Sequence, residues 1–141
     1  MASPIAAIAI PDPALVVTFR GQLGVANAAT NVPMYKKASD GKYYLLDTTV
    51  TVETAGENGV AISLEKGQID EYVNFIASGK VIAEGSFTQG HTYVGGAAGA
   101  IEIDSLADSS NWYKTHLFHA GAVSGSNTVL FIGPVATGVT A

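Results

Sequence analysis

Short runs of β-branched and aromatic residues, each ended by a glycine, recur along most of this sequence. Between Val50 and Val135 the runs consist of Val, Ile, Thr, Phe and Tyr, and most gaps between turns are about one short strand long. Strands that return every ~8–12 residues are typical of a sandwich or a barrel. No segment has the periodicity of a long helix. The glycines that mark these turns include Gly56, Gly59, Gly67, Gly79, Gly85, Gly90, Gly95, Gly99, Gly121, Gly125 and Gly133.

This regular spacing of short strands and turns predicts an all-β fold, either a compact β-sandwich or a barrel-like domain of short antiparallel strands with almost no helix. The 141 residues fit one domain, which we place at residues 15–141. A domain of this size buries roughly 68–70% of the surface that its unfolded chain exposes, so a core can form without disulfides.

Residues 1–14 are predicted to form an extended N-terminal arm. Prolines remove backbone donors and favour extended conformations, and isoleucines alternate with alanines between them. The alternative is a disordered terminus, but the isoleucines make the segment too hydrophobic for a free tail. We therefore expect the arm to dock on a neighbouring molecule. The predicted partner-binding residues are Pro4, Ile5, Ile8, Ile10, Pro11 and Pro13.

Local patterns predict individual strands and turns. Ser39-Asp40-Gly41 between two strand-like runs indicates a hairpin, and Ser78-Gly79-Lys80 indicates another turn. Alternation of Val50 and Val52 with threonines indicates a half-buried strand over 48–54. A single helical turn is expected over 105–111, and 133–141 reads as a small-residue tail. Further strands are expected at 15–20, 34–37, 43–46, 60–64, 69–77, 81–83, 92–94, 100–103, 112–119 and 128–132.

Composition excludes several classes of function. The chain has no cysteine, so a disulfide scaffold and a cysteine-type zinc site are excluded. Its net charge is −5 and its basic residues are scattered, which argues against nucleic-acid binding. No stretch of ~18 apolar residues predicts a membrane span. Charged residues make up 13% of the chain, against about 25% in an average domain, so part of the surface is expected to be buried against other subunits or a partner.

The candidate chemical groups are sparse. His116 and His119 form an H-x2-H pair, but in a regular strand they point to opposite faces and could share a metal ion only across a bulge. The acidic residues Glu102, Asp104 and Asp108 lack the spacing of a calcium loop. We therefore predict no metal site, no cofactor and no catalytic residue.

Two further features carry no catalytic pattern. The segment Gly95-Gly96-Ala97-Ala98-Gly99 has no following Lys-Ser or Lys-Thr and is predicted to be a turn, not a phosphate loop. Trp112 and Tyr113 are expected on opposite faces of one strand, with Trp112 as a core or interface anchor. A carbohydrate-binding platform is the alternative for these aromatic rings.

Several short motifs follow one another along the second half of the chain. They are Gly59-Val60-Ala61-Ile62, Lys66-Gly67-Gln68, Ala77-Ser78-Gly79-Lys80-Val81, Gln89-Gly90-His91-Thr92-Tyr93-Val94, Gly99-Ala100-Ile101, Ser105-Leu106-Ala107-Asp108, Ala120-Gly121-Ala122 and Thr128-Val129-Leu130-Phe131-Ile132. In this order, over roughly residues 40–138, they resemble the capsid cement (decoration) proteins of tailed bacteriophages.

The resemblance implies a small all-β structural protein of the virion, made in the host cytoplasm and usually trimeric. Such a protein binds the outer surface of the expanded capsid near three-fold and quasi-three-fold axes and ties neighbouring major capsid subunits together. The expected partners are the major capsid protein and further copies of this chain. The alternatives are a phage tail or fibre β-module and a carbohydrate-binding module, while an enzyme is not expected.

Overall fold

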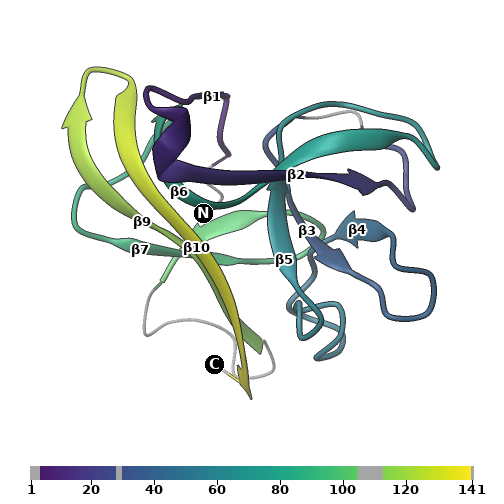
Figure 1. Ribbon diagram of the computed structural model, residues 1–141. Helices are drawn as coiled ribbons and strands as arrows, with labels where there is room; N and C mark the ends of the chain where they lie inside the picture. Colours follow the sequence, from purple (N-terminus) through teal and green to yellow (C-terminus); the bar gives the residue numbers. More distant parts are fainter. Residues whose placement is uncertain (1–3, 28–29, 105–112, 141) are drawn as a thin grey trace.

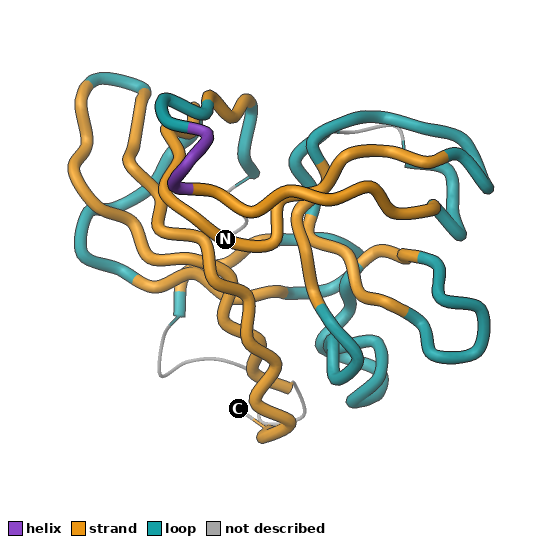
Figure 2. Tube along the Cα trace, viewed as in Figure 1, coloured by secondary structure: helices purple, strands orange, loops and turns teal. Residues whose placement is uncertain are grey.

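The computed structural model describes residues 4–27, 30–104 and 113–140, and these residues form a curled antiparallel sheet, a half-barrel (Figures 1 and 2). The predicted all-β class is confirmed, and the sole helical element in this part of the chain is one 3-10 turn. The elements are β1 (Ala7–Ala9), η1 (Pro13–Leu15), β2 (Val16–Gln22), β3 (Pro33–Lys36), β4 (Tyr43–Leu45), β5 (Val60–Ser63), β6 (Tyr72–Glu84), β7 (Thr92–Gly95), β8 (Ile101–Ile103), β9 (Tyr113–Ser124) and β10 (Asn127–Thr140).

The long strand β6 organises the sheet because different strands pair with its two halves. Its first half pairs with β2 and β5, and its second half pairs with β1 and β10. The main hydrogen-bonded path runs β4-β3-β5-β6-β10-β9-β7-β8. Strands far apart in the sequence therefore lie side by side, as β6 and β10 do in Figure 1.

The first half of β6 belongs to a small, almost closed ring of strands. Leu23, just after β2, forms a bridge with Tyr43 of β4, so the order β2-β6-β5-β3-β4 nearly returns to its start. This ring of strands is narrow at Gly21. A Cβ at this position would lie 2.9 Å from the aromatic side chains of Phe75 and Tyr43. The core of this half consists of Leu23, Met34, Ala61, Val73 and Phe75.

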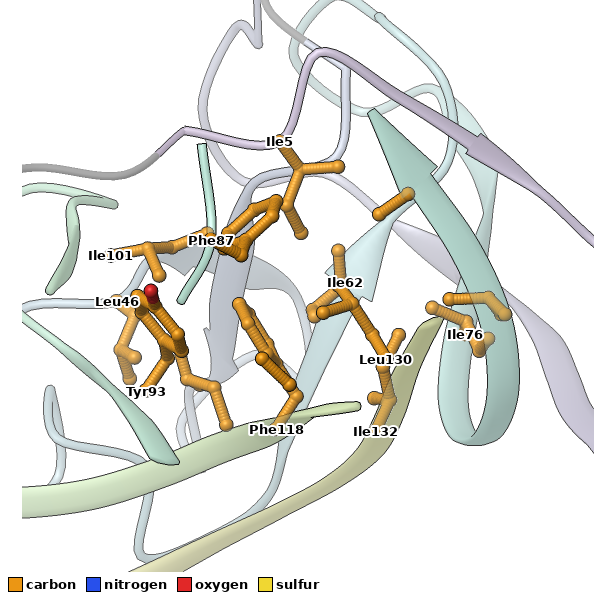
Figure 3. Packing of buried hydrophobic residues seen from close by; sticks show 14 of the residues in the cluster. Ile5, Leu46, Ile62, Ile76, Phe87, Tyr93, Ile101, Phe118, Leu130 and Ile132 are labelled. Atoms are coloured by element: carbon orange, nitrogen blue, oxygen red, sulfur yellow. The ribbon is translucent and has the colours of Figure 1, made fainter. Parts of the chain in front are cut away.

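The second, larger core lies where the two ends of the sheet curl toward each other (Figure 3). Tyr93 and Phe118 stack with ring centroids 5.2 Å apart, and Phe87 meets both rings edge-on. From the other end of the sheet, Leu46 and Ile62 join the same cluster. The backbone fixes this approach, because Gly99 N donates to Leu46 O at 2.7 Å.

The hairpin turn and most of the predicted strands are confirmed. The Asp40-Gly41 turn joins β3 and β4, with Gly41 at a φ of 71°. The strands expected at 15–20, 34–37, 43–46, 60–64, 92–94 and 100–103 correspond to β2, β3, β4, β5, β7 and β8. The strand expected at 112–119 corresponds to β9 over its described residues, and the one at 128–132 lies within β10.

The turn predicted at Ser78-Gly79-Lys80 is wrong, because β6 continues through it. Gly79 has a φ of 132°, and a Cβ built there would lie 2.3 Å from the carbonyl oxygen of Leu15. A glycine is therefore needed at position 79 because the chain that enters β2 passes close to it. It does not mark a point where β6 reverses direction. The same position pairs with Val16 on one side and Ile132 on the other.

The strand predicted over 48–54 is also wrong, since this segment consists mainly of turns and Val50 is 62% exposed. Short polar side chains satisfy the backbone locally here. Asp47 Oδ1 accepts from the backbone N of Thr49 at 2.9 Å, and Thr54 Oγ1 donates to Asp47 O at 2.7 Å. Such hydrogen bonds compete with strand pairing, so the alternation of valines with threonines is not sufficient to predict a strand here.

At the C-terminal end, the predicted tail over 133–141 is wrong for the described residues, because β10 runs to Thr140 beside β9. The helical turn predicted over 105–111 and the predicted anchor Trp112 lie outside the described residues.

Candidate functional site

One row of side chains crosses four neighbouring strands on the outer face of the sheet. Directly paired residues of antiparallel strands share a face, and the pairs Lys80–Phe131, Phe131–His119 and His119–Thr92 connect β6, β10, β9 and β7. The neighbours of these residues along each strand, such as Val81, Leu130 and Ala120, are buried in the core. The row therefore faces away from the core, and Phe131 is 49% exposed within it.

His116 and His119 lie on the same face, contrary to the prediction of opposite faces. Tyr93 of β7 pairs with Phe118, but the next residue, Val94, pairs with His116, so one residue of β9 is extra at this point. The bulge turns both Leu117 and Phe118 into the core and leaves the histidines outside it. The sequence gives no signal for this bulge except the two consecutive large apolar residues themselves.

A groove of about 400 Å³ lies beside this row, and both histidines line it. Gly133 has no side chain, so it lines the groove with backbone atoms only. The space beside it is open, since a Cβ at this position would have no atom within 4 Å. None of the described residues that line it is acidic. The lining residues are Gly79, Lys80, Thr92, His116, Phe118, His119, Phe131, Ile132 and Gly133.

More large apolar side chains are exposed near the groove. Val135 of β10, 57% exposed, pairs with His116, and Val17 of β2, also 57% exposed, pairs with Ser78 of β6. Leu15, at the end of η1 just before β2, is 52% exposed. We call Val17, Phe131, Val135 and the groove the outer apolar face. A rigid sheet that displays such side chains is suited to docking another macromolecule.

The predicted arm is anchored in its own chain. β1 pairs with β6, from Ala7 opposite Glu84 to Ala9 opposite Ile82. Ile5 is 5% exposed and packs in the larger core beside Phe87, as Figure 3 shows. Ile8 and Ile10 are half-buried and pack against the same core. These isoleucines therefore pack against the core of their own chain, and their contact with a partner stays a prediction.

The prolines of the arm differ from its isoleucines. Pro4, Pro11 and Pro13 are exposed, and Pro13 begins the 3-10 turn that Asp12 caps through a 3.0 Å bond to Ala14 N. Contact between these three prolines and a partner remains a prediction.

The acidic candidates Glu102 and Asp104 lie within β8 and just after it. Asp104 Oδ1 accepts from Lys114 Nζ at 2.6 Å, so this carboxylate is paired with a cation. Asp108 lies outside the described residues. Among the residues that the structure describes, no group of three or more His, Asp or Glu could hold a metal ion.

A second hollow of about 750 Å³ lies near the β9–β10 turn. Its walls include Phe87, Tyr93 and Ile103, with Glu84 at the rim, and Thr88 N donates to Tyr93 Oη at 2.8 Å. The rings belong to the core, so this hollow is an opening onto packed aromatic residues.

A charged cluster stabilises the β3–β4 hairpin. Tyr44 Oη donates to Asp40 Oδ2 at 2.6 Å, and the backbone N of Lys42 donates to Asp40 Oδ1 at 2.9 Å. These two hydrogen bonds, the first being the stronger cause, lower the pKa of Asp40. The bond to Asp40 raises the pKa of the Tyr44 hydroxyl. The cluster explains why this hairpin forms and offers no reactive group.

Comparison of the chain with protein-family models, with curated proteins and with solved structures finds no match. In the described part of the chain, no helix has the length and hydrophobicity needed to cross a membrane.

Proposed function

We propose that this protein is a structural component of a phage virion that binds the outer surface of the expanded capsid and cements neighbouring major capsid subunits. The observation that supports this most is the outer apolar face, where Val17 of β2 and Phe131 and Val135 of β10 are about half exposed on two strands that both pair with β6. A face of this kind buries apolar surface on contact with another protein. The proposal that the partner is the major capsid protein rests on the motif order described above.

A trimer at the three-fold and quasi-three-fold axes is part of the proposal. The chain has a low content of charge, 13%, so several of its surfaces can be buried in contacts. Many copies on one shell add modest individual affinities into a large stabilisation of the whole capsid, because each bound copy links subunits that are already held close together. The role is mechanical, and it requires no catalytic group.

Protection of capsids tests the mechanical role. Expanded heads that lack this protein should withstand a higher temperature before they release DNA once the purified chain is added. A Phe131→Ala variant, added at the concentration that half-saturates the heads with unaltered protein, should protect less. Equal release of DNA with and without the chain would contradict the cementing role.

A further inference from the structure

The bulge in β9 creates an arrangement that the proposed function does not use. His116 and His119 both lie on the outer face and line the same groove. The two residues between them, Leu117 and Phe118, are both in the core. Along the strand the two histidines are therefore nearest neighbours on one face. Their cross-strand partners on β7, Thr92 and Val94, are two residues apart, about 6.6 Å between Cα atoms in a regular strand, and the bulge in β9 brings the two histidines opposite them. At that spacing two imidazoles can turn toward one ion.

Thr92 lies beside one of these rings. It pairs with His119 across β7 and β9, and its Oγ1 lies 3.4 Å from His119 Nδ1. An imidazole whose Nδ1–H donates to this hydroxyl presents the lone pair of Nε2 on its far side. Metal-binding histidines are commonly held in this way by a hydrogen bond to the nitrogen that does not bind the metal.

The charge of the groove permits a cation at the histidines. Lys80 is the one charged residue among the described residues that line the groove, and Phe131 of β10 lies between it and His119 in the row. Two strand spacings separate their backbones, about 9.6 Å. The Lys80 side chain is exposed, so water and salt weaken its repulsion of a bound cation without abolishing it.

We propose that His116 and His119 bind one divalent transition-metal ion, of the class Zn²⁺, Ni²⁺ or Cu²⁺, through their imidazole nitrogens. Imidazole suits these ions, whereas Ca²⁺ and Mg²⁺ prefer oxygen ligands. Water occupies the remaining coordination positions. Because Ni²⁺ precedes Cu²⁺ in the general order of affinity, Cu²⁺ binds more tightly than Ni²⁺. The site belongs to the purified chain and does not depend on a capsid.

Calorimetric titration of the full-length protein with each metal salt tests the site. We expect one ion per chain, with binding at least ten-fold weaker in His116→Ala and in His119→Ala. The matched control is His91→Ala, which removes the third histidine, an exposed residue that does not line the groove. If a His→Ala variant loses its β-sheet circular dichroism, His→Gln at the same position replaces it. Absence of saturable binding by all three ions, or equal affinity after removal of both histidines, would overturn the proposal.

Thr92 supplies a separate test that leaves both ligands in place. Thr92→Val removes the hydroxyl and nearly keeps the shape, so metal affinity should fall by about ten-fold or more, and Thr92→Ser should restore it. Unaltered affinity in Thr92→Val would show that the hydroxyl does not position the ring, and it would contradict the geometry proposed for His119. Binding to Ca²⁺ or Mg²⁺ as tight as to Ni²⁺ would exclude imidazole ligation.

Discussion

Phe131 of β10 and His119 of β9 are direct cross-strand partners, and both side chains lie on the outer face of the sheet. Leu130 and Ala120, the neighbouring pair, are completely buried. The same two strands thus pack the core with one face and present an aromatic ring and an imidazole to the surroundings with the other. The proposed functions depend on this second face.

Phe131→Ala should weaken capsid binding by about ten-fold or more, because a large aromatic ring at the centre of an interface commonly contributes more than 1 kcal/mol. The folded protein should lose little stability, since half of the ring is already exposed to solvent. Binding is measured by titration onto heads and stability by urea denaturation. The matched control is Val50→Ala, an exposed apolar residue in the turns after β4. Equal losses of binding in the two variants would show that the outer apolar face has no special role.

Ile5→Ala should destabilise the fold by about 2–5 kcal/mol, the usual cost of truncating a buried aliphatic side chain. Removal of the first fourteen residues should destabilise it further, because β1 and its pairing with β6 are lost as well. Chemical denaturation measures both effects, with Pro11→Ala, an exposed position, as control. Unaltered stability without the arm would contradict its place in the core.

Gly79→Ala should cost at least about 2 kcal/mol, because it combines an unfavourable backbone conformation with a steric clash. The added Cβ would lie 2.3 Å from Leu15 O and 2.6 Å from Val16 Cα. Both are backbone atoms, so no side-chain rotation can relieve the clash. In the control Gly133→Ala, the new methyl group meets no atom within 4 Å, and stability should change by less than about 0.5 kcal/mol. Similar thermal midpoints for the two variants would refute this account of β6.

The Asp40–Tyr44 pair should give the fold a small acid sensitivity. The pKa of Asp40 is lower in the folded state, so the stability that it contributes is present above its ordinary pKa of 3.8 and is lost as the pH falls through the folded value. Tyr44→Phe removes the main cause of the shift and should reduce this loss. The measurement is the urea midpoint as a function of pH below 5 in both proteins. Parallel curves would contradict the assignment.

The hydrogen bond between Tyr44 and Asp40 should also make the stability of the fold depend on pH in the alkaline range. The pKa of the Tyr44 hydroxyl is raised in the folded state, so its contribution is complete below the ordinary value of 10.0 and disappears as the pH rises through the folded value. Burial also raises the pKa of Tyr35 and of Tyr43, so Tyr44→Phe, which cannot ionise at this position, should reduce the alkaline loss without removing it. Tyr72→Phe, at an exposed tyrosine of β6, should leave it unchanged when the urea midpoint is followed into the alkaline range.

The sequence predicts the all-β class and most short strands, because glycine turns and β-branched runs are local signals. The Asp40-Gly41 hairpin is predictable for the same reason. What fails depends on distant parts of the chain. Gly79 looks like a turn until Leu15 is known to cross it, and Ile5 looks like an interface residue until Phe87 is known to pack beside it.

The candidate site is less predictable than the strands. The irregularity at Leu117 is visible only in how β9 pairs with its neighbours β7 and β10, and a one-residue shift in register moves a side chain to the other face of the sheet. The shared face of His116 and His119 therefore follows from strand pairing, which one sequence does not determine. The row that joins Lys80, Phe131 and His119 has the same origin, since these residues come from three strands.

Co-sedimentation of the purified chain with expanded phage heads that lack it tests the central proposal most directly. We expect saturable binding with a copy number that matches the three-fold and quasi-three-fold positions of the shell, and markedly less bound protein for Phe131→Ala at the same concentration. Folded protein that remains in the supernatant at every concentration would contradict the proposal that this chain is a capsid cement protein.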